Sequence, residues 1–309
     1  MADLTHDLET GDVVRRALAE DRASHDVTTA LLGAAADEIA TARFEAEGTF
    51  IVAGVPVIAT VFQQLDPEAS VIAEIEEGAA VSPGAIIATV RATARALLGG
   101  ERVALNFLQR LSGVATTTRA AVNAVAGTSA HITHTRKTTP GLRALELYAV
   151  RIGGGVDNRA SLADAVLWKD NHWAMLERDG GSLRDALGRA ARGMPVIVEV
   201  ESDAQLDAAL AAGVTHVLVD NQSPEQVAVW ARRAGPHVTI QASGGITPAT
   251  ARAYATAGAH LIAIGALTHS PPAAPIRLEI SASEPPRTST PRATAPPRRS
   301  PAPSDSPTR

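Results

Sequence analysis

Six short apolar runs, which alternate with amphipathic segments between about residues 130 and 267, constrain the fold of this chain most strongly. The runs are His131 to Thr135, Ala165 to Trp168, Val196 to Val200, His216 to Val219, Val238 to Gln241 and Leu261 to Ile264. Such alternation is typical of βα units, in which helices connect the strands of a parallel sheet. Ser202, Ser223 and Thr247 stand where helices should begin, because each offers a side-chain oxygen to a first helical turn. We therefore expect an α/β barrel.

Polar and glycine residues follow the apolar runs directly. In an α/β barrel the carboxyl ends of the strands meet at one mouth, where functional side chains gather. We therefore predict that these residues, although scattered in sequence, face a single cavity. They are Arg136 and Lys137, Lys169 and Asp170, Glu199 and Glu201, Asp220, Ser243 to Gly245, and Gly265.

The segment Thr135 to Gly141 reads Thr-Arg-Lys-Thr-Thr-Pro-Gly and combines two cations with three hydroxyl groups at a strand end. A guanidinium offers a planar fork to a carboxylate or phosphate, and an ammonium supplies a compact charge. We interpret the segment as anion-binding, with a solvated basic turn as the alternative. Gly153 to Gly155, followed by Arg159, would add close backbone approach and a further cation, although a glycine run also suits a hinge.

Two glycine-containing segments, Ser243 to Gly245 and Gly265 to Leu267, have the pattern of the paired phosphate-binding loops of barrels. Simple turn glycines are the alternative. Glu199, Glu201 and Asp220 supply the opposite charge, and Glu199 and Glu201 should share one face of a strand. Carboxylates at such a mouth suit Mg²⁺, sugar hydroxyls or a developing positive charge, and a structural ion pair is the alternative.

Composition excludes several classes of function. The chain has no cysteine, which removes disulfides, thiolate metal sites and a cysteine nucleophile. A net charge of -5 and 3% aromatic residues give no general surface for nucleic acid. The first dozen residues lack the basic start and apolar core of a signal peptide, and no apolar run reaches membrane-spanning length. We expect a cytoplasmic protein without nucleic-acid or membrane partners.

The first hundred residues have a different pattern. Helical stretches near Val13 to Glu20 and Val55 to Leu65 flank apolar segments, which predicts a separate α+β domain. A helical region from about Thr93 to Gly113, and another as far as Val125, should carry the chain into the barrel. Residues 281–309 are rich in Pro, Ser, Thr and Arg without apolar periodicity, and we predict a disordered tail there.

Several long motifs, in a fixed order between about Ala17 and Ile280, resemble the quinolinate phosphoribosyltransferase family, the carboxylating nicotinate-nucleotide pyrophosphorylases of NAD biosynthesis. The motifs are Glu101 to Thr118, Thr135 to Gly155, Leu167 to His172, Glu199 to Glu201, Asp220, Ser243 to Ile246 and Gly265 to Ser270. The resemblance implies an N-terminal α/β sandwich over residues 1–112, joined by a strand returning over 270–280. It implies an incomplete α/β barrel of the seven-stranded type over residues 113–269, before the tail at 281–309.

The resemblance also implies an activity. Family members transfer the ribose 5-phosphate of phosphoribosyl pyrophosphate to the nitrogen of quinolinate with Mg²⁺. They release nicotinate mononucleotide, pyrophosphate and carbon dioxide. A homodimer is implied too, in which Arg102 of one subunit completes the site of its partner.

Carried over by position, the resemblance implies a role for each candidate site residue. The pyridine dicarboxylate would be held by Arg102, Arg136, Arg159 and Lys169, with Asn158 beside them. Lys137 would lie near the sugar pyrophosphate, and Glu199 and Asp220 would bind ribose hydroxyls or Mg²⁺. The 5-phosphate would be surrounded by Ser243, Gly244, Gly245, Gly265 and His269. The candidate catalytic residues are Lys137, Lys169, Glu199 and Asp220.

The chain departs from the family pattern near the acid pocket. The family usually has Asn-His-Arg where this chain has Asp157-Asn158-Arg159, and Leu147 stands in place of a usual lysine. Lost cations and an added carboxylate would weaken binding of a dianionic acid. Two alternatives therefore stay open, a divergent paralogue that uses another heteroaromatic acid and a non-catalytic family member. A Schiff-base aldolase using Lys169 or Lys137 fits a barrel but not the extended motifs.

Overall fold

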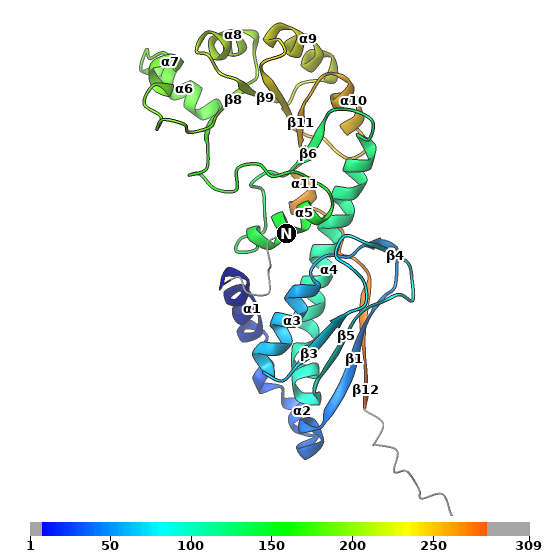
Figure 1. Ribbon diagram of the computed structural model, residues 1–309. Helices are drawn as coiled ribbons and strands as arrows, with labels where there is room; N and C mark the ends of the chain where they lie inside the picture. The colour runs from blue at the N-terminus through cyan, green and yellow to red at the C-terminus, as the bar shows by residue number, and fades with distance from the viewer. Residues whose placement is uncertain (1–7, 283–309) are drawn as a thin grey trace, which may run out of the picture.

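The computed structural model describes residues 8–282 of the chain and consists of two parts (Figure 1). One part packs helices against an antiparallel sheet, and the other is a parallel sheet with helices on its outside. Helix α4 (Ala94–Ala124) runs from the first part into the second. None of the helices within residues 8–282 has the length and hydropathy needed to cross a bilayer.

The antiparallel sheet has the strand order β12-β1-β5-β3. Residues of β1 alternate between buried and more exposed, because successive side chains of a strand point to opposite faces. Phe44 on the buried face lies against Phe62 of α3, with 6.2 Å between the ring centroids. The elements of this part are α1 (Leu8–Glu20), η2 (Ala23–His25), α2 (Val27–Ala30), η3 (Gly33–Asp37), β1 (Ile39–Ala46), β2 (Phe50–Ile51), α3 (Val55–Leu65), β3 (Ser70–Ala73), β4 (Ala80–Val81), β5 (Ile86–Thr93) and β12 (Ile276–Ala282).

Strand β12 brings the end of the described chain back to the first part. It pairs antiparallel with β1, from Ala46 opposite Ile276 to Ala40 opposite Ala282. The strand therefore includes the first two residues of the segment 281–309 that the sequence predicted as a tail. The remainder of that predicted tail, 283–309, lies outside the described residues.

Helix α4 is one continuous helix of 31 residues, where the sequence suggested two helical regions meeting near Gly113. The hydroxyl of Thr93 caps its start by accepting a hydrogen bond from the Ala96 N–H at 3.3 Å. Gly113 lies inside the helix, and a Cβ at this position would come within 2.1 Å of the Pro272 carbonyl oxygen. The glycine therefore permits close packing of the segment that leads to β12.

The parallel sheet has the strand order β6-β11-β10-β9-β8-β7, and every pair in it is parallel. All six apolar runs of the sequence form its strands, which confirms the predicted α/β class. The seven-stranded expectation needs a correction: Thr133 of β6 and Val156 form an isolated parallel bridge, with no seventh strand among the described residues. The elements are β6 (His131–Thr133), α5 (Arg143–Ile152), β7 (Val166–Trp168), α6 (Asp170–Arg178), α7 (Leu183–Leu187), β8 (Val196–Val200), α8 (Asp203–Ala211), β9 (His216–Asp220), α9 (Pro224–Ala234), β10 (Thr239–Ser243), α10 (Ala251–Thr256), β11 (Leu261–Ala263) and α11 (Ala266–His269).

Two of the three predicted helix starts are confirmed. The Ser202 and Ser223 hydroxyls cap α8 and α9 by accepting bonds from backbone N–H groups three residues later. Thr247 was wrong as the start of α10, which begins at Ala251. Its hydroxyl instead accepts a bond from the Thr250 N–H at 3.3 Å, and the Thr250 hydroxyl accepts one from the Thr247 N–H at 3.0 Å. The two threonines thus close a turn before the helix.

Candidate active site

A cavity of about 320 Å³ opens at the carboxyl ends of the parallel strands. Polar side chains from the ends of β6 to β10 line it, together with apolar side chains such as Leu167, Ile197 and Leu218. The fold therefore brings polar residues from distant strand ends together at one cavity. Five residues predicted to face the same cavity do not line it, namely Asp170, Glu201, Gly244, Gly245 and Gly265. The predicted site residues that line the cavity are Arg136, Lys137, Asn158, Arg159, Lys169, Glu199, Asp220 and Ser243.

A larger hollow of about 550 Å³ lies between α1, η2 and α3. Its lining includes Arg15, Arg22 and His25 but no carboxylate. Volume alone does not make it the better candidate, because the strand-end cavity combines both signs of charge with the phosphate-type loops.

Two guanidinium groups meet on one side of the cavity. Arg159 donates from Nη1 to the Ala165 carbonyl oxygen at 3.1 Å, which holds the side chain beside β7. Burial, followed by the nearby charge of Arg136, lowers the pKa of Arg159 below its ordinary value. Arg136 Nε is buried and has no hydrogen-bond partner within residues 8–282. A buried donor without a partner favours a ligand that can accept from it.

Lys169 and Glu199 form an ion pair at the rim, with 2.7 Å between Nζ and Oε2. The Glu199 side chain is 7% exposed and the Lys169 side chain 43%, so the carboxylate is the more deeply placed partner. Trp173 Nε1 donates to the Glu199 carbonyl oxygen at 2.9 Å and fixes this end of β8. The structural ion pair considered for Glu199 is therefore present, and it also sets the position of Lys169.

Asp220 and Glu201 differ in their relation to the cavity. Asp220 lines it, accepts a bond from Asn221 Nδ2 at 2.5 Å, and forms no ion pair among the described residues. Glu201, expected on the same face as Glu199, is exposed and does not line the cavity. Strand β8 ends at Val200, so the alternation of faces no longer applies at Glu201.

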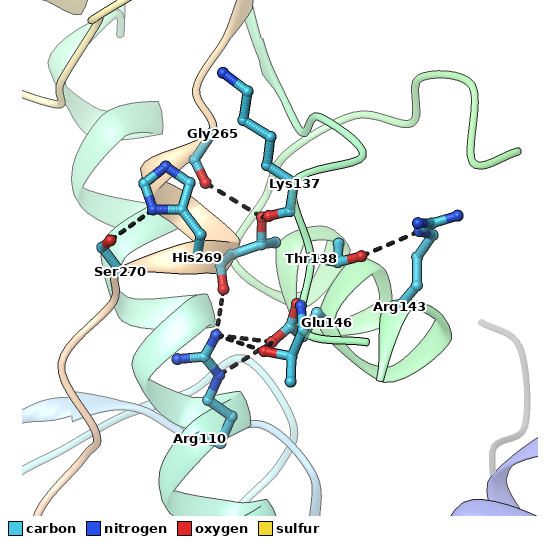
Figure 2. Close-up of polar contacts among 10 residues, drawn as sticks. Arg110, Lys137, Thr138, Arg143, Glu146, Gly265, His269 and Ser270 are labelled. Carbon is cyan, nitrogen blue, oxygen red and sulfur yellow. Dashed lines mark hydrogen bonds and ion pairs between the residues drawn. The ribbon is translucent and has the colours of Figure 1, made fainter. Parts of the chain in front are cut away.

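The two glycine loops follow strands β10 and β11, and the first of them adjoins the cavity through Ser243. Gly244 and Gly245, which follow Ser243, have φ of +95° and +62°. Gly265 lies close to Lys137 and His269, because a Cβ at Gly265 would come within 3.2 Å of Lys137 Cδ and of His269 Nε2 (Figure 2). His269 Nδ1 lies 2.5 Å from the Ser270 hydroxyl. Gly244, Gly245, Gly265 and His269 do not line the cavity themselves, but Gly244 and Gly245 follow the lining residue Ser243, and Gly265 and His269 lie close to the lining residue Lys137.

Arg102 lies apart from the cavity of its own chain. It is exposed on α4 and lines a separate hollow of about 450 Å³ together with Glu20, Asp21 and Arg110. The predicted role of Arg102 in a partner subunit stays a prediction.

The departures from the family pattern have clear local environments. Asp157 forms an ion pair with Arg151 at 3.0 Å. Asn158 lines the cavity, but its N–H donates to His134 Nε2 at 3.1 Å and its Oδ1 accepts from the Arg159 N–H at 2.8 Å. Burial lowers the pKa of His134, in agreement with a neutral ring whose Nε2 accepts. Leu147 is buried on α5 and does not line the cavity.

Gln241 of β10 is a cavity residue that the sequence prediction missed. Its side chain is 2% exposed, and Oε1 lies 2.9 Å from His216 Nε2. The period of two along a strand places Gln241 on the same face as Ser243, so the signal was present. This periodicity was not applied to Gln241, because the residue was assigned to an apolar run.

Comparisons with known proteins agree with this geometry. Residues 26–112 match the N-terminal domain of quinolinate phosphoribosyl transferase, and residues 114–279 match its C-terminal domain. The carboxylating nicotinate-nucleotide pyrophosphorylase of Mycobacterium leprae is 43% identical over 269 residues, covering 84% of this chain and 93% of the relative. A probable enzyme of the same name from Bacillus subtilis is 38% identical, covering 85% of this chain and 91% of the relative.

Solved structures give the same result. The nicotinate-nucleotide pyrophosphorylase from Francisella tularensis superposes with a TM-score of 0.80 at 32% identity, covering 88% of this chain and 96% of that chain. The corresponding protein from Ehrlichia chaffeensis has a TM-score of 0.80 at 31% identity, covering 87% and 98%. Sequence motifs, fold and cavity therefore agree, and the chain belongs to the quinolinate phosphoribosyltransferase family.

Proposed function

We propose that the protein converts quinolinate and phosphoribosyl pyrophosphate to nicotinate mononucleotide, pyrophosphate and carbon dioxide. The observation that carries this proposal is the strand-end cavity, where four cations face two carboxylates beside two glycine loops. Both substrates are polyanions with parts that become cationic during the reaction. A cavity with both signs of charge suits such a pair.

In this proposal, three of the cations bind the acid and the fourth binds the phosphate-bearing substrate. Arg136, Arg159 and Lys169 hold the two carboxylates of the acid, and Asn158 donates a neutral hydrogen bond beside them. Guanidinium groups suit this task because their planar forks match carboxylate oxygens. Lys137, next to the glycine loop at Gly265, takes the phosphate-bearing substrate. The acid is then held with its nitrogen toward the ribose, which is the main requirement for transfer.

The carboxylates serve the ribose. As the bond to pyrophosphate breaks, the sugar carbon becomes positive, and Glu199 and Asp220 can stabilise that charge or bind the ribose hydroxyls. Formation of the new bond makes the ring nitrogen cationic, and this charge stabilises the electron pair left on the adjacent ring carbon when carbon dioxide departs. That carbon then takes a proton from water to give nicotinate mononucleotide. Carbon dioxide therefore leaves without a dedicated acid. Ser243, Gly244, Gly245, Gly265 and His269 surround the 5-phosphate in this assignment.

Mg²⁺ is part of the proposal. No group of three or more potential metal ligands occurs among His, Cys, Asp and Glu of residues 8–282. Glu199 and Asp220 fit an ion that takes one or two carboxylates and completes its shell with substrate phosphates and water. When bound, Mg²⁺ would offset the charge of the leaving pyrophosphate.

A homodimer and a cytoplasmic location complete the proposal. Arg102 is exposed and outside its own cavity, so a partner subunit would have to bring it to an acid site. The phosphorylated substrate carries several charges and does not cross membranes unaided, which supports a location where such metabolites are made.

Purified protein with phosphoribosyl pyrophosphate, Mg²⁺ and either quinolinate or nicotinate tests the function. Nucleotide and pyrophosphate, separated by chromatography, should appear with quinolinate in equal amounts. The Arg136→Gln variant should lose most turnover, whereas Arg95→Gln should keep it, because Arg95 only pairs with exposed Asp37. Absence of product with active substrate stocks would reject the proposal.

Asn158 favours a second candidate, a family member that transfers phosphoribose to another heteroaromatic acid. Its neutral amide is bonded to main-chain atoms, with Oδ1 accepting from the Arg159 N–H at 2.8 Å and Nδ2 donating to the His134 carbonyl oxygen at 3.4 Å. The family pattern would place a histidine at this position. Turnover of nicotinate or another monocarboxylate, but not quinolinate, would support this candidate. A gain of quinolinate turnover in Asn158→His would then identify the residue that set the preference.

A further inference from the structure

Glu146 is a buried carboxylate that the proposed reaction does not use. It lies on α5, is 0% exposed, and does not line the cavity. Its Oε1 accepts bonds from Arg110 Nε at 3.1 Å, Arg110 Nη2 at 2.7 Å and the Thr139 hydroxyl at 2.7 Å. Its Oε2 accepts a bond from the Thr139 N–H at 3.0 Å. Burying a charge is costly unless it is paired and fully bonded, and here it is both.

The bonds of Arg110 continue from Glu146 to helix α11. Arg110 Nη2 also donates to the carbonyl oxygen of Thr268, a fully buried residue of α11. The Thr268 hydroxyl donates to the Lys137 carbonyl oxygen at 2.9 Å and lies 3.2 Å from the Gly265 carbonyl oxygen. We call Glu146, Arg110, Thr139 and Thr268 the Glu146 network.

The Glu146 network joins three helices to one loop. Helix α4 supplies Arg110, α5 supplies Glu146 and α11 supplies Thr268, while the loop contributes Thr139 and the Lys137 carbonyl oxygen. In Figure 2 the Lys137 side chain extends away from the network, and His269 lies beside Gly265. The Thr268 hydroxyl therefore holds the main chain of Lys137, while the Lys137 ammonium remains available to bind a ligand in the cavity.

We propose that Glu146, Arg110 and Thr268 are positioning residues, which fix Lys137 against helix α11 so that Lys137 and His269 meet a phosphorylated substrate at a set spacing. This inference rests on the proposed function, because it assigns phosphoribosyl pyrophosphate to that side of the cavity. Ordering the loop before binding lowers the entropy lost when the substrate arrives. None of the three residues has to touch the substrate.

Thr268→Val tests the link with the smallest change. Valine keeps the shape of threonine but removes the hydroxyl that donates to Lys137. Thr118→Val is the matched control, because Thr118 is also fully buried and its hydroxyl donates only to the Val114 carbonyl oxygen within α4. Calorimetric titration with phosphoribosyl pyrophosphate and Mg²⁺ gives Kd, and steady-state turnover gives KM for each substrate.

We expect Thr268→Val to raise the Kd and KM for phosphoribosyl pyrophosphate about tenfold, which corresponds to a loss of about 1.4 kcal/mol. The KM for the acid should change by less than about threefold, and Thr118→Val should leave both constants unchanged. A general loss of stability would not separate the two substrates in this way. Equal constants for Thr268→Val and Thr118→Val would overturn the inference.

A second set of variants protects the test against misfolding. Glu146→Gln, Arg110→Met and the double variant form a thermodynamic cycle on Kd for phosphoribosyl pyrophosphate. If the network acts as a unit, the double variant binds no more weakly than the weaker single variant, whereas additive losses would contradict the inference. If the wild-type protein binds phosphoribosyl pyrophosphate but makes no product, the proposed function fails and the binding comparison still decides the inference. If the wild-type protein does not bind it, both fail.

Discussion

Replacing Gly244 with alanine should disrupt the loop after β10 more than the same change at Gly245. Gly244 has a φ of +95°, and a Cβ there would lie 2.2 Å from Asn221 Oδ1 and 2.6 Å from the Asn221 nitrogen. Gly245 has a φ of +62°, and a Cβ there would meet no atom within 4 Å. The two neighbours therefore separate the cost of a collision from the cost of a positive φ.

The expected magnitudes follow from these two costs. An alanine with positive φ costs about 1–2 kcal/mol, and a collision with backbone adds about 1–3 kcal/mol. Gly244→Ala should therefore lose about 3 kcal/mol of unfolding free energy, against about 1.5 kcal/mol for Gly245→Ala. At roughly 2–4 °C per kcal/mol for domains of this size, Tm should fall by roughly 6–12 °C and 3–6 °C.

Thermal unfolding followed by circular dichroism measures both changes. Gly213→Ala is the control for φ alone, because Gly213 has a φ of +81°, no atom near a Cβ, and a place outside the cavity. Gly244→Ala should also raise the KM for phosphoribosyl pyrophosphate, since Asn221 adjoins Asp220 and must move. If the Tm of Gly244→Ala falls no further than that of Gly245→Ala, the close approach to Asn221 does not limit this loop.

Three other predictions concern charged groups. Lys169→Met leaves the nearly buried Glu199 carboxylate without its ion-pair partner at 2.7 Å. The free energy of unfolding should therefore fall by about 1–3 kcal/mol, and turnover should be lost. An unchanged Tm in calorimetry would contradict a stabilising role of this pair. Burial raises the pKa of Glu77, although two N–H groups and the Tyr148 hydroxyl donate to its carboxylate. The folded protein therefore binds this proton more tightly than the unfolded chain does. The resulting contribution to stability is complete below the unfolded pKa of 4.5 and is lost as pH rises through the folded pKa. The Tm of wild type relative to Glu77→Gln should therefore be most favourable near pH 4 and decline toward neutral pH, and a difference that grows with pH would refute the sign. Arg102→Ala and Lys169→Met, each inactive alone, should recover part of the activity when mixed and allowed to exchange subunits, because one shared site would then be intact; no recovery despite exchange would argue against the shared site.

The strands of the parallel sheet were predictable because the sequence alternates in hydrophobicity and then changes to polar residues. Val196 to Val200 is a strand with the predicted bounds, and Glu199 was predicted at the cavity from its place on that strand. The alternation of faces does not extend to Glu201, two residues after Glu199. A strand pattern does not show where the backbone turns away, and Ser202 already begins the next helix.

Contacts between distant segments were not predictable from local pattern. Gly113 suggested a helix end, but it lies within α4, where the close approach of the Pro272 carbonyl oxygen leaves no room for a side chain. Glu146 was read only as part of a family motif, since nothing in its neighbourhood in sequence reveals Arg110, 36 positions earlier. Leu147 was linked to the acid pocket by motif alone, whereas the fold buries it away from the cavity.

The charges that line the cavity explain why an anion should bind there. The Lys169 charge is largely offset by Glu199, whereas the Arg136 charge contributes to the lowered pKa of Arg159 by repulsion. A dianionic acid between these guanidinium groups would replace that repulsion with attraction and give Arg136 Nε an acceptor. Acid binding should therefore raise the pKa of Arg159, because the bound acid favours its charged form. The same argument predicts that a monocarboxylate, which offers one negative charge to two guanidinium groups, binds less tightly than a dicarboxylate.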